Sequence, residues 1–305
     1  MSLKLTILGC HSATPRISAH PTAQLLEIKN HLFLIDCGEG TQVQLRKYKA
    51  KFSKIKRIFI SHLHGDHVFG LIGLVSTFRL LNHEMELHIY GPKGIKELIT
   101  TQLRLSNSYT SYPIIFHELE SNKSELIFED KKVEVFTIPL DHRIYTNGFL
   151  FREKIGERKL NMKAISKFSE IEICDYQNLK NGRDFKLNNG KILPNKELTL
   201  PPPRPLSYAF CSDTTFKPDI VPTIKNVDLL YHEATFLKDR EDLAITTKHS
   251  TAEQAAKIAK LADVSELIIG HYSGRYNNLN DFQSEAQQIF PKTTLAIEGK
   301  IIEVN

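Results

Sequence analysis

The chain has 305 residues, of which 41% are hydrophobic and 25% charged, and its formal net charge is +5. This composition is ordinary for a globular protein with a sizeable core, and it excludes disorder and collagen-like structure. No apolar run approaches the roughly 18 residues of a membrane-spanning helix, and the segment 1–9 is too short and polar for a signal peptide. We therefore expect a cytoplasmic protein of one or two domains that makes no membrane contact.

Strand and helix patterns alternate in the first half of the chain. We predict strands at 3–8, 24–28, 32–35, 56–60 and 86–90, and helices at 41–48, 68–81 and 95–105. Four further strands are predicted at 114–118, 126–128, 133–138 and 148–151. Regular patterns return later, with strands at 206–211, 227–231, 266–269, 295–298 and 301–304 and helices at 251–261 and about 282–289. Ser250 and Glu253 are expected to form a capping box at the start of the first of these helices.

Residues 154–205 differ from both halves, because they lose clear periodicity, are rich in Lys and Asn, and end in the proline-rich segment Pro201–Pro205. A structureless stretch of this length inside a compact domain is usually functional, so we predict an inserted arm or a lid here. The remaining pattern, with strands and helices in both halves, predicts a layered α/β domain over residues 1–305 that has helices outside two sheets.

The four cysteines have no C-x-x-C spacing, which argues against a disulfide framework and against a thiolate zinc site. We interpret all of them as small buried hydrophobic residues. They are Cys10, Cys37, Cys174 and Cys211.

Positive charge is concentrated in two stretches. Between Arg152 and Arg204 there are 12 Lys or Arg and 7 Asp or Glu, so this stretch carries the whole excess of +5. The segment 42–59 contains no acid and seven basic residues, Arg46, Lys47, Lys49, Lys51, Lys54, Lys56 and Arg57. Basic runs usually lie on solvated faces. In a chain that also carries a hydrolytic metal site, they favour a polyanionic substrate.

The sharpest motif is His62-x-His64-x-Asp66-His67, which directly follows an apolar strand. Imidazoles and a carboxylate are ligands that zinc prefers at catalytic sites. His62 and His64 project to the same side of an extended segment, because the side-chain period of a strand is two. Asp66 and His67 fall where the chain turns into the next helix, where they can face a second ion. Four potential ligands within six residues therefore favour a dinuclear site.

This motif resembles that of the metallo-β-lactamase superfamily, whose fold is a four-layer αββα sandwich that supplies further ligands from later strand ends. Three such residues are present in the expected order, since His142, Asp213 and His271 each follow a predicted apolar strand. The resemblance implies two zinc ions per chain, bridged by Asp213 and sharing a hydroxide. The implied ligands are His62, His64 and His142 for one ion and Asp66, His67 and His271 for the other.

Three local motifs within this pattern resemble those of ribonuclease Z, the endonuclease family that matures tRNA 3′ ends. They are His-Glu-Ala-Thr at 232–235, His-Ser-Thr at 249–251 and His-x-Ser-x-Arg-Tyr at 271–276. The resemblance implies a zinc-dependent endoribonuclease that removes the 3′ trailer from precursor tRNA, leaving a 3′-hydroxyl on the tRNA and a 5′-phosphate on the trailer. It implies that Asp66 takes a proton from the attacking water, that His249 protonates the leaving 3′-oxygen, and that Glu233 orients His249.

The same resemblance gives the arm a role. Ribonuclease Z inserts a tRNA-binding arm between the ligands equivalent to His142 and Asp213, which is where residues 154–205 lie, and Lys and Arg there gain affinity for an RNA backbone by releasing counterions. Family members are typically homodimers, so a dimer is implied. The family's Gly-Pro arm tip is absent from 167–181, and the loop at 15–20 keeps the proline of Pro-x-Lys-x-Arg-Asn but not its Lys, Arg and Asn.

Two alternatives compete with this interpretation. One is a small-molecule hydrolase on the same scaffold, such as a phosphodiesterase, thioesterase or lactonase; the basic arm and the His249 motif argue against it. The other is a non-enzymatic RNA-binding protein, which the presence of all seven metal ligands disfavours. His/Asp sites also accept manganese or cobalt in place of zinc.

Overall fold

The computed structural model describes residues 3–305, so residues 1 and 2 of the predicted domain lie outside the described range. The chain forms two compact units. The larger comprises the residues up to Glu129 together with Val133–Arg152 and Leu206–Asn305, and the smaller comprises Asp130–Lys132 and Glu153–Pro205. Within residues 3–305, no helix has the length and apolar character needed to cross a membrane.

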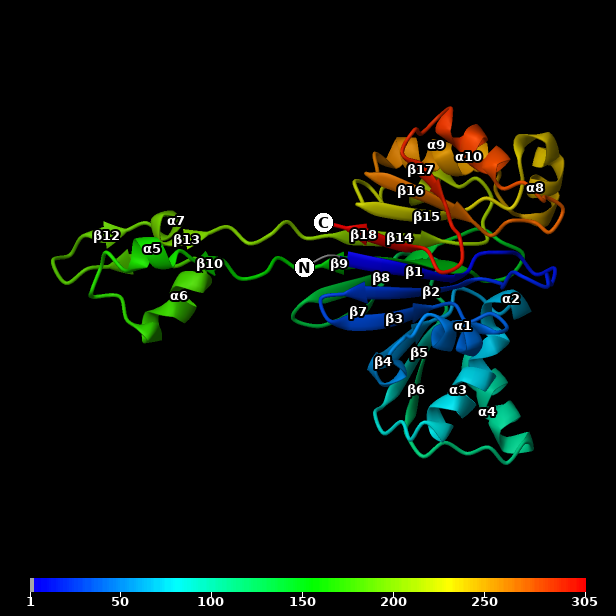
Figure 1. The fold of residues 1–305 in the computed structure, drawn as a ribbon, viewed down its shortest axis with the longest axis horizontal. Coiled ribbons are helices and arrows are strands. Elements are labelled where there is room, and N and C mark those ends of the chain that lie inside the picture. The colour runs from blue at the N-terminus through cyan, green and yellow to red at the C-terminus, as the bar shows by residue number, and fades with distance from the viewer. Residues whose placement is uncertain (1–2) are drawn as a thin grey trace. The chain divides into compact units, whose positions relative to one another are not determined.

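Two seven-stranded sheets form the centre of the larger unit (Figure 1). The first has the order β18 (Ile301–Val304), β1 (Leu3–Gly9), β2 (Ala23–Ile28), β3 (His31–Ile35), β4 (Ile55–Phe59), β5 (Leu87–Pro92) and β6 (Ile114–Leu119). The second has the order β17 (Thr293–Leu295), β16 (Glu266–Gly270), β15 (Leu229–Glu233), β14 (Ser207–Cys211), β9 (Asn147–Glu153), β8 (Val133–Pro139) and β7 (Leu126–Glu129). Strands β3 to β6 are parallel, as are β14 to β17.

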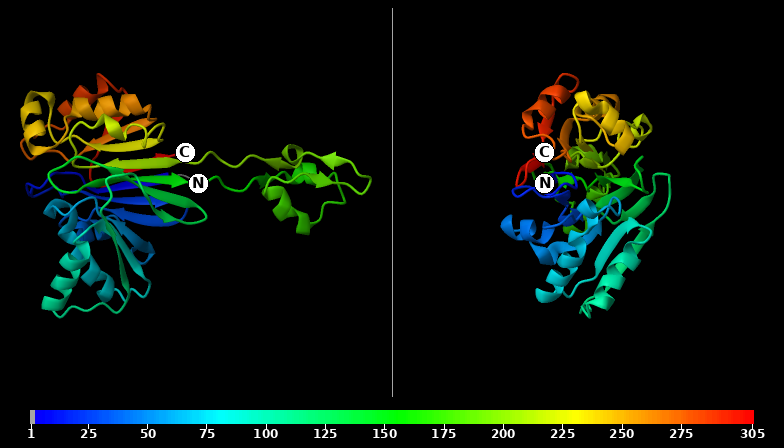
Figure 2. Two further views of the ribbon diagram at one scale, coloured as in Figure 1. Left: turned by 180° about the vertical axis from the view of Figure 1, so that it is seen from behind. Right: turned by 90° about the vertical axis from the view of Figure 1, so that its right-hand side faces the viewer.

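Helices cover the outer faces of both sheets (Figures 1 and 2). Those beside the first sheet are α1 (Thr41–Lys47), α3 (Gly70–Leu80) and α4 (Ile95–Leu105), with the short α2 (Gly65–Val68) before α3. Those beside the second are α8 (Glu241–Thr247), α9 (Ala252–Ala262) and α10 (Asn280–Gln287). The order helix, sheet, sheet, helix confirms the predicted four-layer αββα class.

The alternation of buried and half-buried side chains along the strands shows which faces of the sheets form the core. In β1, Leu3, Leu5 and Ile7 are fully buried, whereas Lys4 and Thr6 between them are half-buried on the other face. The inward side chains of both sheets form one hydrophobic cluster that is rich in aromatic rings. A second cluster fills the space between the first sheet and α1, α3 and α4. Strands β14 and β15 are buried along their whole length because both of their faces are covered.

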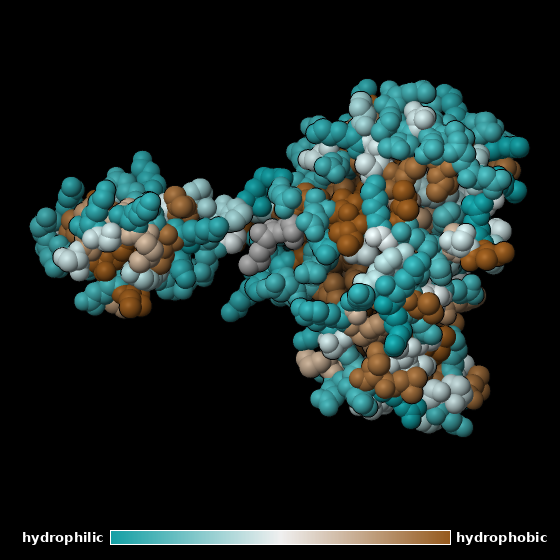
Figure 3. Space-filling view, viewed as in Figure 1, coloured by the Kyte–Doolittle hydropathy of each residue, from teal (hydrophilic) through white to brown (hydrophobic). Residues whose placement is uncertain are grey.

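The smaller unit has secondary structure of its own, so the prediction of a structureless stretch was wrong. Its elements are β10 (Lys159–Leu160), α5 (Met162–Ile165), α6 (Tyr176–Lys180), β11 (Phe185–Lys186), β12 (Ile192–Leu193), α7 (Asn195–Leu198) and β13 (Thr199–Leu200). Elements of two to five residues are too short to produce a visible periodicity. A small core that includes Ile165, Leu179 and Leu198 holds them together. The surface of this unit in Figure 3 is largely hydrophilic, with scattered apolar side chains.

Two predictions near strand and helix ends were also wrong. The capping box of α9 is formed by Thr251 and Gln254, one residue later than predicted, because the hydroxyl of Ser250 donates instead to the carbonyl oxygen of Thr214 at 2.7 Å. A strand was predicted at 295–298, but β17 spans Thr293–Leu295 and so shares only Leu295 with it. Glu298 lies beyond the strand, where its carboxylate pairs with His20 at 3.0 Å.

Helix α8 was not predicted, nor were the 3-10 turns Phe52–Lys54, Ile173–Asp175, Pro218–Ile220 and Lys238–Arg240. Three of the four cysteines are buried as expected, but Cys174 is exposed. It belongs to a turn of the smaller unit, whose few core residues leave little volume in which to bury a further side chain.

Candidate metal centre

The seven predicted metal ligands come together at one edge of the sandwich. They follow the ends of four strands: His62, His64, Asp66 and His67 come after β4, His142 after β8, Asp213 after β14, and His271 after β16. Because β4 lies among parallel strands of one sheet, and β14 and β16 among those of the other, their carboxyl ends can meet at a common edge. Four distant segments thus converge on one site.

The first group of donors consists of three histidine nitrogens and one carboxylate oxygen. Nε2 of His62 lies 3.0 Å from Nδ1 of His64, which lies 3.3 Å from Nε2 of His142. Oδ2 of Asp213 is 3.5 Å from the same nitrogen of His62. All four ligand atoms lie within 4.8 Å of one another.

The second group shares Asp213. Its other oxygen, Oδ1, lies 3.2 Å from Nε2 of His67 and 3.2 Å from Nε2 of His271. Oδ2 of Asp66 completes the group at 3.3 Å from the same nitrogen of His271. Asp213 therefore offers one oxygen to each group, which is the arrangement expected of a bridging ligand.

The donor set fits divalent metal ions. Nε2 of His67 is buried and has no hydrogen-bond partner, although it faces the carboxylates of Asp66 and Asp213. A buried polar atom without a hydrogen bond is costly, and coordination to a cation would satisfy it. Imidazole nitrogens and carboxylate oxygens converging at this spacing are typical of zinc and related transition-metal sites.

Four of the five ligand histidines are held by a second partner, which for His62 is the hydroxyl of Ser61, 3.0 Å from its Nδ1. Nδ1 of His67 lies 2.7 Å from the buried carboxylate of Asp36, and Nδ1 of His142 donates to the carbonyl oxygen of Lys248 at 2.7 Å. Nδ1 of His271 lies 2.8 Å from the hydroxyl of Thr235. Such partners fix the orientation of the ring and leave the other nitrogen for the metal.

Asp36 was missed by the sequence analysis. A signal was available, because Asp36 directly follows the apolar strand β3, as His271 directly follows β16. Asp36, Asp213 and His271 also share a left-handed backbone, with φ of 55°, 54° and 65°. This conformation is uncommon for residues other than glycine, and such strain concentrates at functional sites.

The carboxylates of the site are held in their charged form. Burial raises the pKa of Asp66, but the charge of His67 and a hydrogen bond from His271 outweigh it and bring the pKa below its ordinary value. Burial likewise opposes ionisation of Asp213, and the surrounding histidines lower its pKa well below the usual range. The site therefore presents negative charge to a cation.

His249 and Glu233 form a buried pair beside the ligands. Nδ1 of His249 lies 2.8 Å from Oε1 of Glu233, and the hydroxyl of Thr235 donates to the other oxygen of Glu233 at 2.6 Å. Burial lowers the pKa of His249, but the charge of Glu233 and its hydrogen bond outweigh burial and raise the pKa to about 9. The ring of His249 lies 4.9 Å from that of His142, between centroids.

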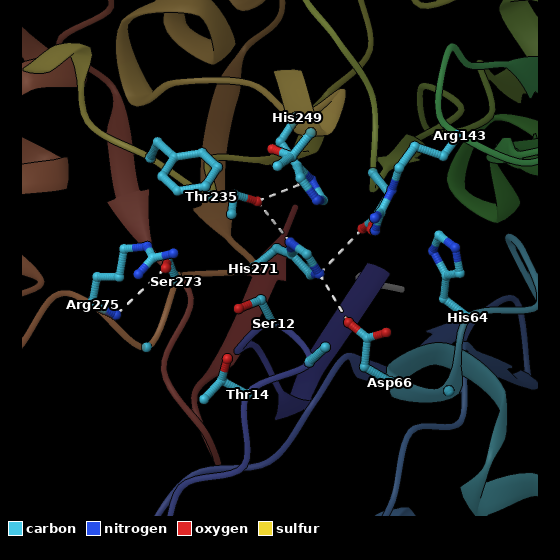
Figure 4. A pocket seen from close by; sticks show the side chains of 16 residues that line it. Ser12, Thr14, His64, Asp66, Arg143, Thr235, His249, His271, Ser273 and Arg275 are labelled. Carbon is cyan, nitrogen blue, oxygen red and sulfur yellow. Dashed lines mark hydrogen bonds and ion pairs between the residues drawn. The ribbon is translucent and has the colours of Figure 1, made fainter. Parts of the chain in front are cut away.

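A pocket of about 660 Å³ opens onto this centre (Figure 4). His64, Asp66, Asp213, His249 and His271 line it, while the other three ligand histidines lie behind them. Figure 4 shows Arg143 and Arg275 on opposite sides of this group, so the pocket combines cationic side chains with the metal-binding residues. Tyr276, next to Arg275, does not line it; its hydroxyl accepts a hydrogen bond from the backbone of Leu237 at 3.1 Å.

Comparison with known proteins gives matches along the whole chain. Residues 3–156 match a family model described as "Anti-Pycsar protein Apyc1". The chain is 46% identical over 302 residues to the ribonuclease Z of Bacteroides thetaiotaomicron, covering 99% of this chain and 95% of that protein. It is 45% identical over 298 residues to the ribonuclease Z of Porphyromonas gingivalis W83, covering 98% of both.

Two solved structures resemble the fold closely. The short form of human tRNase Z has a TM-score of 0.73 and 27% sequence identity, and 99% of each chain is covered. The metallo-β-lactamase fold protein YhfI from Bacillus subtilis has a TM-score of 0.69 and 18% identity over the full length of both chains, which shows the fold alone.

Proposed function

The chain belongs to the ribonuclease Z family, and from this premise we infer that it is a metal-dependent endoribonuclease that removes the 3′ trailer from precursor tRNA. The observation that carries this conclusion is the match to ribonuclease Z proteins at 45–46% identity over nearly the whole length of both chains. The Apyc1 model, by contrast, matches residues 3–156 alone, the half of the chain that contains the His62–His67 motif.

We propose that the metals are two zinc ions per chain. His62, His64 and His142 would hold one, Asp66, His67 and His271 the other, and Asp213 would contribute an oxygen to each. When bound, such a pair of ions activates water near neutral pH and stabilises the charge that develops on the phosphoryl oxygens. The convergence of these donors and the unpartnered Nε2 of His67 support this assignment.

We assign the two proton transfers of the reaction to two side chains of the protein. The oxygen of a water molecule attacks phosphorus as the bond from phosphorus to the 3′-oxygen of the tRNA breaks. Asp66 accepts the proton of the water, and His249 donates a proton to the departing 3′-oxygen. The tRNA is left with a 3′-hydroxyl and the trailer with a 5′-phosphate. Glu233 orients His249 and supports its protonated form, and their 2.8 Å separation favours this role.

We propose that residues 154–205 form an RNA-contacting arm on the single metallo-β-lactamase-like domain of residues 1–305. This stretch has an excess of positive charge, and side chains such as Lys163, Lys167 and Lys186 are exposed. Both properties favour binding to the phosphate backbone of RNA. We further propose that the enzyme works in the cytoplasm as a homodimer, in which the arm of one subunit holds the tRNA for the site of its partner.

A precursor tRNA labelled at its 5′ end and carrying a 3′ trailer tests the function directly. The wild-type protein should make a single cut near the base that precedes the trailer, and a chelator or the substitution His64→Ala should abolish that cut. Intact RNA after incubation with wild-type protein that contains about two zinc ions per chain would contradict the proposal. A panel of phosphodiesters, thioesters and lactones would then test the small-molecule alternative.

A further inference from the structure

A second cavity lies on the outer face of the first sheet, just beyond the end of α1. It has a volume of about 350 Å³ and shares no residue with the pocket over the metal centre. Its walls come from β1, from the β2–β3 turn and from the segment that follows α1, and the buried side chains of Leu25 and Leu32 belong to its lining. Four lysines line it, Lys4, Lys49, Lys51 and Lys54, and we refer to it as the basic pocket.

Three of the four lysines of the basic pocket have no acidic residue opposite them. Lys4 differs, because Glu27 of β2, the one acidic residue of the lining, and Glu303 of β18 lie opposite it in the register of the sheet. Lys49, Lys51 and Lys54 are exposed, and within residues 3–305 none of the four lysines forms an ion pair. A concave surface lined by uncompensated like charges concentrates the potential and attracts a ligand with several negative charges.

An aromatic ring lies among these cations. Tyr48 lines the basic pocket, and the ammonium group of Lys47 lies 5.2 Å from its ring centroid. The ring packs closely against Gly299, where a Cβ atom would come within 2.5 Å of Cε1 of the tyrosine. Glycine at this position therefore leaves room for the ring. Lysines around a half-buried aromatic ring are typical of surfaces that bind single-stranded or exposed nucleotides.

The basic pocket and the metal centre lie at opposite ends of the same strand. Lys4 is near the start of β1, and the carbonyl oxygen of Cys10, just beyond its end, accepts a hydrogen bond from the backbone N–H of the metal-ligand candidate His271 at 2.7 Å. Lys4 and Cys10 are six positions apart along the extended chain, which corresponds to about 20 Å. A tRNA precursor is a polyanion much longer than this distance, so one molecule can reach both places.

We propose that the basic pocket is a second RNA-binding site, which holds backbone phosphates of the precursor tRNA at the opposite end of β1 from the metal centre. This proposal rests on the proposed function, because its ligand is the substrate of the metal centre. The site belongs to the body of the enzyme and not to the arm, and three of its four lysines come from the acid-free run at 42–59 that the metal centre does not use.

The test compares two full-length variants with the same loss of charge. One carries Lys49→Gln, Lys51→Gln and Lys54→Gln. The control carries Lys225→Gln, Lys260→Gln and Lys292→Gln, which replace exposed lysines away from both pockets. For each, the Kd for precursor tRNA is measured over a series of salt concentrations, together with the rate of hydrolysis of bis(p-nitrophenyl) phosphate, which needs the metal centre but no RNA contact.

The basic-pocket variant should bind precursor tRNA roughly tenfold or more weakly than the control at low salt, and the slope of log Kd against log salt should fall by about 1 per lysine removed. Hydrolysis of the small diester should be the same in both. Equal tRNA affinity in the two variants, with active wild-type enzyme, would overturn the proposal for the basic pocket. Failure of the wild type to cut precursor tRNA would instead overturn the proposed function.

A further titration of the wild type, with adenosine monophosphate and with inorganic phosphate, tests whether the basic pocket binds the phosphates of tRNA or those of a small ligand. Both should bind only in the millimolar range, because each presents one phosphate group to the lysines. Lysine-dependent binding of either at micromolar concentration, with tRNA affinity unchanged in the variant, would show a small-ligand site and overturn the RNA assignment.

Discussion

His249 donates from Nδ1 to the carboxylate of Glu233 at 2.8 Å, in a pair whose acid is fully buried and whose histidine lines the pocket. Because Nδ1 faces Glu233, Nε2 is the nitrogen left to contact a substrate. The pKa of about 9 means that the ring carries a proton at neutral pH. His249 also belongs to neither of the two donor groups that share Asp213, so its place in the site suits a proton donor better than a ligand of either proposed ion.

The first prediction follows from this difference. His249→Ala should lower kcat for precursor tRNA by about 10²- to 10⁴-fold, the range typical of a lost general acid, while the metal content stays at the wild-type value. A substrate with sulfur in place of the 3′-oxygen at the cut should recover most of the rate, because a thiolate leaves without protonation. Single-turnover cleavage of the two substrates measures this.

Asp66→Asn is the matched control for that rescue. It removes the acceptor of the water proton, so the sulfur substrate should not restore its activity. If His249→Ala lost metal to the same extent as His64→Ala, His249 would be a ligand and its assignment as the acid would be wrong.

Asp36 gives the second prediction. Asp36→Asn can adopt the same left-handed backbone, since asparagine tolerates φ near 55°. Its amide oxygen can still accept a hydrogen bond from the backbone N–H of Ser61. It removes the charge that holds Nδ1 of His67. Metal affinity should therefore fall about 10- to 100-fold, as is typical of a lost partner of a ligand histidine. Competition with a chromogenic chelator measures the affinity.

Excess metal should restore cleavage by Asp36→Asn, because all the coordinating atoms remain. A variant that stays inactive when fully loaded with metal would mean that Asp36 acts on the reaction itself and not through His67.

The metal ligands could be predicted because a short motif, His62-x-His64-x-Asp66-His67, is specific enough to reveal the resemblance to the metallo-β-lactamase superfamily. That resemblance implied where to look for the other ligands, and His142, Asp213 and His271 each lie within a few residues of the end of a strand. Strand and helix periodicity by itself predicted a layered α/β domain with helices outside two sheets, and the resemblance supplied the αββα class.

Other features depend on contacts that no local pattern contains. The bond between Asp36 and His67 joins residues 31 positions apart, and the hydrogen bonds that hold the buried Glu233 come from Thr214, Thr235 and His249. The N-cap of α9 was predicted at Ser250, one residue before the observed cap at Thr251, because Ser250 bonds instead to Thr214, 36 residues away in the chain. In the smaller unit, elements of two to five residues leave no periodicity to detect.

Asp213 provides the third prediction. Its two oxygens face different donor groups, so Asp213→Asn should impair both metals, whereas His64→Ala should impair mainly one. Bound metal stabilises the folded state by mass action, by about 4 kcal/mol at a thousand times Kd. The wild type should therefore lose at least about 5 °C of Tm on chelation and regain it with zinc.

In Asp213→Asn this metal-dependent difference in Tm should largely disappear, and elemental analysis should find less than half of the wild-type metal. Differential scanning calorimetry with and without chelator makes the comparison. A variant that kept the full metal-dependent rise would show that Asp213 does not bridge the two groups.

Lys248 gives the last prediction, because it contacts the segment of the ligand His142 while its own backbone is strained. Its backbone has φ 56° and ψ 54°, its Nζ lies 2.9 Å from Asp141, and its carbonyl oxygen accepts from Nδ1 of His142. Lys248→Ala keeps the strain and loses an exposed ion pair, so the free energy of unfolding should fall by up to about 1 kcal/mol. Lys248→Gly loses the same pair but relieves the left-handed strain, so it should be about 1 kcal/mol more stable than Lys248→Ala.

Urea unfolding of the two metal-loaded variants measures this difference. Both retain the carbonyl group that holds His142, so their metal affinities should match that of the wild type within about twofold. A glycine variant less stable than the alanine variant would contradict the left-handed conformation of residue 248. A large loss of metal in both would mean that the ammonium group of Lys248, and not its carbonyl oxygen, keeps His142 in place.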